Sequence, residues 1–121
     1  MAFITGIDHV QVAMPPGSED IARTFYSGKL GLAEVPKPAH LAVRGGVWFQ
    51  CGSAQLHLGG ETAFVPAKKA HPALIIEDFA EYVGALARAG LHIHEDEMVA
   101  GRQRASLEDP FGNKLELIER A

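Results

Sequence analysis

The pattern of apolar and polar positions repeats in the two halves of the chain. Residues 7–13 alternate and residues 71–76 run apolar, and both predict strands. Helical spacing of apolar residues follows each strand, from the expected caps Ser18 and Asp78 to the terminating Gly31 and Gly90. Glu81 would complete a capping box with Asp78. Three short strands then follow in each half, near 40–44, 47–51 and 54–59 and near 91–95, 102–108 and 113–119.

Each half therefore has the predicted order β-α-β-β-β, and the chain is expected to be α+β. By length, residues 1–121 form one domain. Module 1 covers about 5–60 and module 2 about 70–120, joined by an exposed linker at 60–70. The Asp-Pro-Phe-Gly-Asn run at 109–113 predicts the turn between the last two strands.

Strand parity separates four candidate metal ligands from the aliphatic side chains of their strands. Because successive residues of a strand point to opposite faces, His9, His57, His71 and Glu116 all lie opposite the aliphatic set. His9 and His71 are 62 residues apart, and His57 and Glu116 are 59 apart. If the two halves fold alike and face each other, three imidazoles and one carboxylate converge on one point.

Composition narrows the function classes. The hydrophobic fraction is 47% and the net charge is −4, which argues against nonspecific nucleic-acid binding. No apolar run reaches the roughly 18 residues of a membrane helix, so no membrane partner is expected. The single Cys51 and the absence of a secretory-signal pattern predict a cytoplasmic protein. Cys51 is interpreted as a small buried hydrophobic residue.

Several segments resemble the vicinal oxygen chelate superfamily, the glyoxalase/bleomycin resistance/extradiol dioxygenase group. They are Ile-Asp-His-Val at 7–10, His-Pro-Ala at 71–73 and, most specifically, Asp-Pro-Phe-Gly-Asn-Lys-Leu-Glu-Leu at 109–117. The resemblance covers essentially the whole chain and implies two modules forming a cupped mixed sheet around a central cleft. It also implies a divalent metal held by residues at the positions of His9, His57, His71 and Glu116.

The resemblance implies a glyoxalase-like enzyme of the lyase or isomerase type. Its substrate would be a small oxygenated anionic molecule that chelates the metal, which could be Fe, Mn, Zn or Ni. One alternative is a metal-free binding protein similar to bleomycin-resistance proteins. Another is an extradiol-type dioxygenase that uses only His9, His71 and Glu116. Fold alone does not choose among them.

His57 departs from the family pattern, because glyoxalase I-like proteins usually carry glutamate at this place. It can be the fourth ligand, a general base or neither, and Glu116 is the second candidate catalytic group. As a fourth ligand, His57 would favour Lewis-acid chemistry over dioxygen activation.

Other polar and aromatic side chains are candidates for substrate binding. Arg102 and Arg104 share parity and could hold a carboxylate or phosphate, although an exposed strand position explains them nearly as well. Gln11 lies on the face of His9, and Trp48 could line a pocket or a dimer contact. His92 and His94 are interpreted as a solvated edge. A homodimer is expected, with the cleft formed within one chain or between chains.

Overall fold

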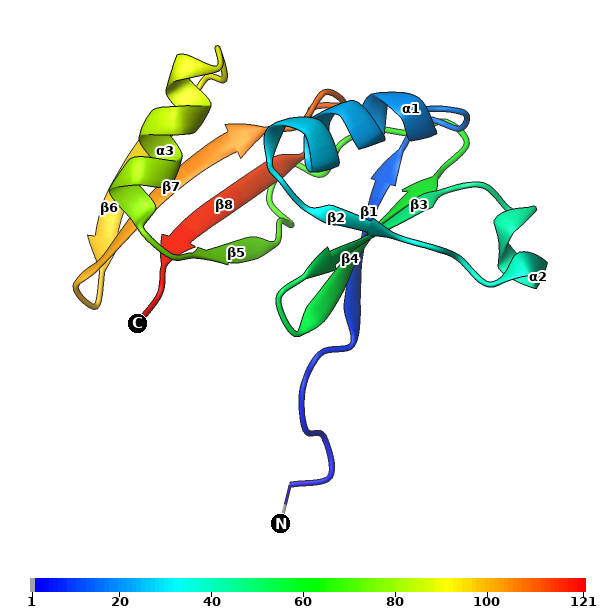
Figure 1. The fold of residues 1–121 in the computed structure, drawn as a ribbon, viewed down its shortest axis with the longest axis horizontal. Helices are drawn as coiled ribbons and strands as arrows, with labels where there is room; N and C mark the ends of the chain where they lie inside the picture. The colour runs from blue at the N-terminus through cyan, green and yellow to red at the C-terminus, as the bar shows by residue number, and fades with distance from the viewer. Residues whose placement is uncertain (1) are drawn as a thin grey trace. The chain divides into compact units, whose positions relative to one another are not determined.

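The computed structural model describes residues 2–121 and confirms the predicted α+β class (Figure 1). It divides into two compact units, with the boundary between Phe64 and Val65, inside the predicted linker. Each unit has its own four-stranded mixed sheet. The units are called module 1 and module 2 below.

Module 1 has the sheet order β1-β4-β3-β2, in which β1 and β4 are parallel and the other pairs antiparallel. A short α-helix continues directly into a π-helical segment, η1, which contacts β2 and β3. The elements are β1 (His9–Met14), α1 (Glu19–Ala22), η1 (Arg23–Lys29), β2 (Ala33–Val35), α2 (Ala39–Ala42), β3 (Val47–Cys51) and β4 (Ala54–Gly60).

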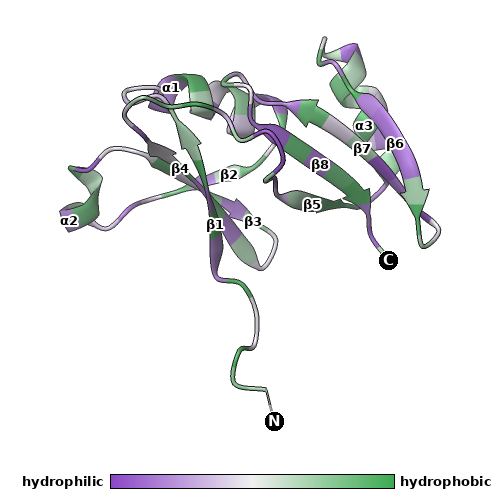
Figure 2. Ribbon diagram, turned by 180° about the vertical axis from the view of Figure 1, so that it is seen from behind, coloured by the Kyte–Doolittle hydropathy of each residue, from purple (hydrophilic) through white to green (hydrophobic). Residues whose placement is uncertain are grey.

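Module 2 repeats this topology with the order β5-β8-β7-β6. Again the first and last strands of the module are parallel neighbours, as expected from the sequence repeat. The elements are β5 (Ala73–Ile76), α3 (Phe79–Arg88), β6 (His94–Val99), β7 (Arg102–Glu108) and β8 (Lys114–Glu119). Hydrophilic residues dominate β6 in Figure 2.

The strand predicted near 40–44 is wrong, because Ala39–Ala42 form the short helix α2. Pro38 occupies its N-cap with φ of −54°, and its carbonyl accepts hydrogen bonds from the backbone N–H groups of Leu41 and Ala42. Proline at a helix start is favourable because its φ suits the helix and its missing N–H is not needed there. The first of the three consecutive antiparallel strands of module 1 is instead β2, at 33–35.

Strand starts and helix caps also differ from the predictions. β1, β5 and β6 begin at His9, Ala73 and His94, each two or three residues later than expected. Ser18 and Asp78 hold the N-cap positions, but neither side chain makes a capping hydrogen bond. Asp78 has φ of +50°, a left-handed conformation that replaces the expected capping box.

The aliphatic faces of both sheets form the cores, as strand parity predicts. In module 1, Phe49 is fully buried and stacks on Tyr26 with ring centroids 5.6 Å apart. In module 2, Leu115 and Leu117 are fully buried. The apolar residues expected to face the core from the helices are only partly buried. Ala22, Phe25, Tyr26, Phe79 and Leu86 are buried and Tyr82 and Val83 half-buried, whereas Ile21, Ala87 and Gly90 are exposed.

The turn at 109–113 is held by the buried Asp109 carboxylate. Its Oδ1 accepts hydrogen bonds from the backbone N–H groups of Phe111 (2.9 Å) and Asn113 (2.8 Å). Its Oδ2 accepts one from the side-chain amide of Asn113 at 2.8 Å. Gly112 has φ of +90°, which favours glycine. This turn fixes where β8 starts, and therefore where Lys114 and Glu116 lie.

We expect Gly112→Ala to destabilise the protein by about 1–3 kcal/mol, because alanine is strained at this φ. Its Cβ would also lie 3.3 Å from Cγ of Pro66. Gly31→Ala is the matched control, since Gly31 has φ of +86° but no atom within 4 Å of the added Cβ. Urea unfolding should show the larger loss for Gly112→Ala. An equal loss in both variants would show that the Pro66 contact does not matter.

Candidate metal and substrate site

Three rings form a parallel stack on the polar face of module 1. Gln11 and Trp48 both pair with His57 across the sheet, which places all three on one face. The Trp48 and His57 rings are stacked with centroids 4.2 Å apart and planes 6° apart. His57 and His9 are also 4.2 Å apart, with planes 13° apart. Lys37 Nζ lies 5.8 Å from the Trp48 ring centre, a cation–π geometry.

Hydrogen bonds fix the histidines of this stack. His57 Nε2 donates to Gln55 Oε1 at 2.9 Å, and His9 Nδ1 donates to Asp8 Oδ2 at 2.9 Å. Burial, reinforced by the neighbouring His9, lowers the pKa of His57 below that of an ordinary imidazole. His57 is therefore a buried, neutral imidazole at neutral pH.

The stack restricts how module 1 can hold a metal. An imidazole nitrogen binds a metal close to the plane of its ring, and two stacked rings inclined by only 13° have planes that do not meet within bonding distance of both. His9 and His57 therefore cannot both coordinate one ion while they are stacked. His9, whose Nδ1 is occupied by Asp8, keeps Nε2 available for a metal. His57 fits a ligand role only if its ring rotates away from Gln55 and Trp48.

Gln11 lies beside the stack and over Gly59. A Cβ at Gly59 would be 2.7 Å from the Gln11 amide nitrogen, so the missing side chain makes room for Gln11. Gln11 itself is exposed. Its amide can therefore both donate to and accept from a molecule on this face.

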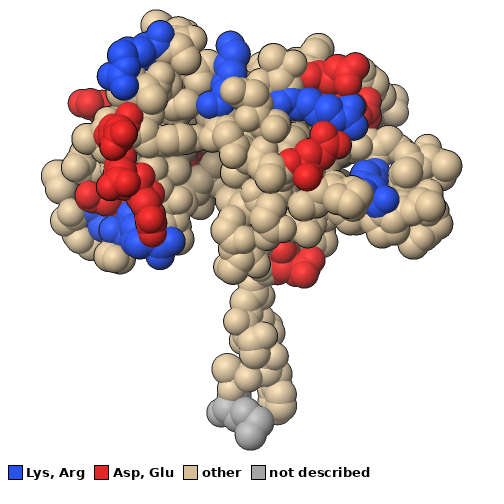
Figure 3. All heavy atoms as spheres, viewed as in Figure 1, with Lys and Arg blue, Asp and Glu red and all other residues tan. Residues whose placement is uncertain are grey.

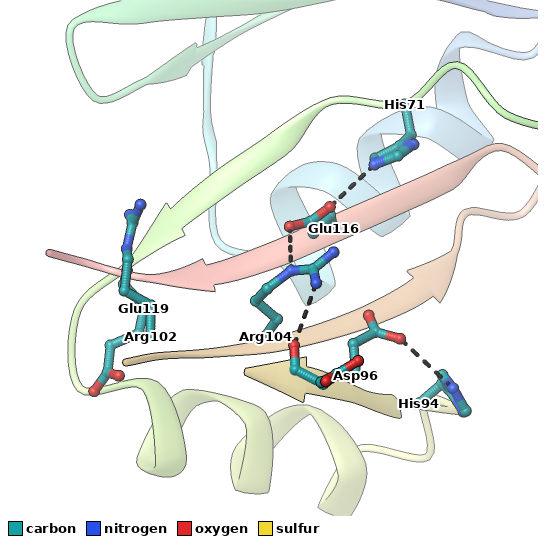
Figure 4. Close-up of polar contacts among 8 residues, drawn as sticks. His71, His94, Asp96, Arg102, Arg104, Glu116 and Glu119 are labelled. Carbon is teal, nitrogen blue, oxygen red and sulfur yellow. Dashed lines mark hydrogen bonds and ion pairs between the residues drawn. The ribbon is translucent and has the colours of Figure 1, made fainter. Parts of the chain in front are cut away.

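In module 2, His71, Glu116 and Arg104 form one hydrogen-bonded chain (Figure 4). His71 Nε2 lies 3.0 Å from Glu116 Oε1, and Arg104 Nε donates to Glu116 Oε2 at 2.9 Å. Arg104 also donates from Nη1 to the Glu97 carbonyl at 3.2 Å. Glu116 is only 8% exposed, so its charge depends on these partners.

The His71–Glu116 pair fits one side of a metal site. His71 Nδ1 donates to the Lys69 carbonyl at 2.7 Å and Nε2 donates to Glu116 Oε1 at 3.0 Å, so a bound metal would replace the proton on Nε2. A backbone carbonyl on the far nitrogen is the usual way in which a protein orients a metal-binding imidazole. The Arg104 hydrogen bond, and then that of His71, lower the pKa of Glu116 against the opposing effect of burial. The carboxylate is thus ionised and ready to bind a cation.

The other candidate residues lie apart from this chain of contacts. Arg102 Nε donates to the Glu119 carbonyl at 2.7 Å, at the end of β8 away from His71 (Figure 4). His94 lies 3.5 Å from Asp96, and His92 is exposed and precedes β6. Burial raises the pKa of the Cys51 thiol, which disfavours the nucleophilic thiolate.

Within residues 2–121, no group of three or more His, Cys, Asp or Glu side chains is arranged as a metal site. Each module alone supplies two candidate ligands: His9 and His57 in module 1, and His71 and Glu116 in module 2. Sequence reasoning missed the supporting residues Asp8, Gln55 and Lys69. Parity places Gln55 on the face of His57, two residues before it on the same strand, but does not indicate the hydrogen bond between them.

We expect the metal-free protein to lose stability as pH falls below about 6.5, the ordinary imidazole value. Because the pKa of His57 is lowered in the fold, the unfolded chain takes up this proton at higher pH than the folded one. His57→Gln should remove this part of the pH dependence, and His40→Gln, at an exposed position, should not. Urea unfolding in EDTA from pH 5 to 8 measures it. An unchanged slope in His57→Gln contradicts the assignment.

Figure 3 shows acidic and basic side chains interspersed on the visible face, without one large basic patch. None of the helices in the described part of the chain is both long and apolar enough to cross a membrane.

No protein-family sequence model matches the chain, and no curated protein sequence does so either. Several solved structures do match the chain. A glyoxalase family protein from Bacillus anthracis is 43% identical with a TM-score of 0.96, and the match covers 100% of this chain and 99% of that one. Lactoylglutathione lyase from Agrobacterium tumefaciens is 22% identical with a TM-score of 0.75, covering 98% and 96%.

An antibiotic binding protein, TnmS3 from Streptomyces sp. CB03234, is 17% identical with a TM-score of 0.77, covering 100% of both chains. The last two matches show the fold alone. The first, at 43% identity over the whole chain, shows the family. The chain therefore belongs to the glyoxalase family, within the vicinal oxygen chelate superfamily.

Proposed function

We propose that this protein is a metal-dependent, glyoxalase-like enzyme of the lyase or isomerase type. Its substrate is a small oxygenated anionic molecule that binds the metal through two neighbouring oxygens. The observation that carries the proposal is the His71–Glu116 pair, in which an oriented imidazole Nε2 and an ionised, buried carboxylate face each other at 3.0 Å.

The proposed ligands are His71 and Glu116 from module 2 and His9 from module 1, with His57 as a conditional fourth. Two imidazoles and one carboxylate suit Fe, Mn, Zn or Ni and leave coordination positions for substrate. The bound ion would supply Lewis-acid polarisation of a substrate oxygen.

His57 has a second proposed role, as general base. Burial and the neighbouring His9 lower its pKa, and a neutral imidazole accepts a proton from substrate. The Trp48 ring offers a flat apolar wall beside it, and the exposed Gln11 amide offers hydrogen bonds to substrate oxygens. Glu116, once it holds the metal, is not free to act as a base.

Arg104 and Arg102 differ in what they can contribute. Arg104 is bound to Glu116 Oε2, so we propose that it positions this carboxylate rather than binding substrate through Nε. Arg102 is held by the Glu119 carbonyl through Nε, and its remaining guanidinium N–H groups can still reach an anion at the end of β8.

Three observations favour the alternatives. Arg104 already neutralises Glu116 without a metal, which suits a metal-free small-molecule binding protein. The fold similarity to an antibiotic binding protein agrees with that class. The stack that keeps His57 off a metal leaves His9, His71 and Glu116, the three-ligand set of an extradiol-type dioxygenase.

Reconstitution with each metal separates the three functions. The enzyme should convert α-oxo or α-hydroxy anions only with a stoichiometric divalent metal and without consuming oxygen. A dioxygenase would consume oxygen with catechols under Fe(II). Ligand binding that is equally tight in EDTA, without turnover, would support the binding protein and overturn the proposal.

We also propose a homodimer. The first residues of the chain carry three exposed apolar side chains, Phe3 (88% exposed), Ile4 (87%) and Ile7 (69%). Exposed apolar groups in succession are typical of a protein–protein contact.

Light scattering of the wild type should give twice the mass of one chain. Replacing Phe3, Ile4 and Ile7 with serine should shift the equilibrium towards the monomer, whereas Val43→Ser and Val65→Ser, at equally exposed single sites, should not. A monomeric wild type would contradict the dimer.

A further inference from the structure

Module 2 contains a pocket of about 800 Å³ that the sequence did not indicate. It lies where β7 runs past the start of β6. The first residue of β6, His94, pairs with Ser106, so Leu107 and Glu108 continue beyond the β6 edge. Its polar lining is Lys68, His92, His94, Ser106, Glu108 and Lys114.

The lining is positively charged in a protein whose net charge is −4. Lys68 and Lys114 contribute two positive charges and Glu108 one negative charge. Within residues 2–121, neither lysine side chain takes part in an ion pair or a side-chain hydrogen bond. Lys114 is moreover half-buried. Glu108 is the cross-strand neighbour of Lys114 but forms no ion pair with it, so an anionic ligand can supply the countercharge that both lysines lack.

The arginines expected to bind an anion are engaged elsewhere. Arg104 is held by Glu116 and Arg102 by the Glu119 carbonyl. The free cations of module 2 that face a pocket are instead the two lysines, with the His92 and His94 imidazoles beside them as hydrogen-bond donors.

The pocket adjoins the candidate ligand Glu116. Lys114 and Glu116 are two residues apart on β8, so they share a face and their Cα atoms are about 7 Å apart. Ser106, which lines the pocket, is the cross-strand partner of Glu116. One small molecule can therefore reach both Glu116 and the pocket.

We propose that this pocket binds an oxyanion, a carboxylate or a phosphate, of the small-molecule substrate. Lys114 and Lys68 supply the countercharge, and His92 and His94 donate hydrogen bonds. The link to the substrate rests on the proposed function, whereas oxyanion binding by the pocket does not require the metal. The substrate then has two vicinal oxygens at one end and an acidic group at the other.

The test is an NMR titration of the metal-free, full-length protein with inorganic phosphate and, separately, with acetate at constant ionic strength. We expect saturable amide shifts at Lys68, His92, His94 and Lys114. Lys68→Gln together with Lys114→Gln should weaken binding at least about tenfold, and Lys29→Gln, in module 1, should leave it unchanged. Tighter phosphate binding assigns a phosphoryl group, and tighter acetate binding a carboxylate.

Two results would overturn the proposal that the pocket binds an oxyanion. One is the absence of saturable shifts at these residues, and the other is an anion affinity in the double variant equal to that of the wild type. If the double variant does not fold, Lys68→Gln alone, at an exposed position, must still weaken binding. A zinc titration of the same samples separates the two proposals. Anion binding without zinc binding would contradict the metal-dependent enzyme but support the oxyanion site. Zinc binding without anion binding would contradict only the oxyanion site.

Discussion

Replacing either member of the His71–Glu116 pair should abolish stoichiometric metal binding. We expect His71→Ala and Glu116→Ala to lower the affinity for a divalent metal by more than about 100-fold. Substitution of residues that only support metal ligands costs about 10–100-fold, and loss of a ligand costs more. The reason is geometric, because His71 Nε2 and Glu116 Oε1 already face each other at 3.0 Å.

Isothermal titration with zinc measures this effect, and circular dichroism checks that each variant folds. His92→Ala is the matched control, since His92 is an exposed histidine of the same module that precedes β6. It should bind zinc like the wild type. If His71→Ala and Glu116→Ala both retain wild-type affinity, the metal does not bind at this pair.

Replacing Arg104 with methionine should lower metal affinity by about 10–100-fold, although Arg104 cannot itself bind a metal. Its Nε holds Glu116 Oε2 and thereby leaves Oε1 directed at His71. Arg104 is also the main cause of the lowered pKa of Glu116. Without it the pKa of the carboxyl rises, so protons compete with the metal at higher pH.

The pH dependence distinguishes this positioning role from general damage to the fold. Metal binding by Arg104→Met should weaken on acidification at a higher pH than binding by the wild type, and Arg104→Lys should restore part of the difference. Arg102→Met is the control, because Arg102 contacts the Glu119 carbonyl and not Glu116. Equal pH profiles in the wild type and Arg104→Met would contradict the assigned role.

The same pairing affects stability. The Glu116 carboxyl has a lower pKa in the folded protein than in the unfolded chain. It therefore stabilises the fold at a pH above the unfolded pKa, and this stabilisation is lost as the pH falls through the folded pKa. The wild type should therefore lose stability in acid below the ordinary glutamate range. In Arg104→Met this acid-dependent part should be smaller.

The fold class could be predicted from the sequence, because the repeat of the two halves and the period-two alternation within each strand are both visible in the order of the residues. It failed where a short segment lacked a clear period, as at 40–44, where Pro38 starts a helix. The capping box was mispredicted at Asp78, whose backbone is left-handed and whose side chain makes no capping hydrogen bond.

Parity indicated the faces of β4 and β8 on which His57 and Glu116 lie, but not their contacts, and it does not apply to His71, which precedes β5. The stacking of His9 on His57 and the hydrogen bond from Arg104 to Glu116 depend on side-chain conformation, which parity does not predict. The oxyanion pocket depends on where β6 begins relative to β7, a boundary that apolar spacing at 91–95 placed three residues too early. Strand ends are set by pairing with neighbours, which the local sequence does not contain.

The central claim is that His71 and Glu116 hold a divalent metal. The most direct test is anomalous diffraction at the zinc edge from crystals grown with Zn²⁺. We predict one anomalous peak about 2.0–2.2 Å from both His71 Nε2 and Glu116 Oε1, with the His71–Glu116 hydrogen bond replaced by two metal bonds. A map without a peak at this position, with the 3.0 Å hydrogen bond intact, would contradict the account.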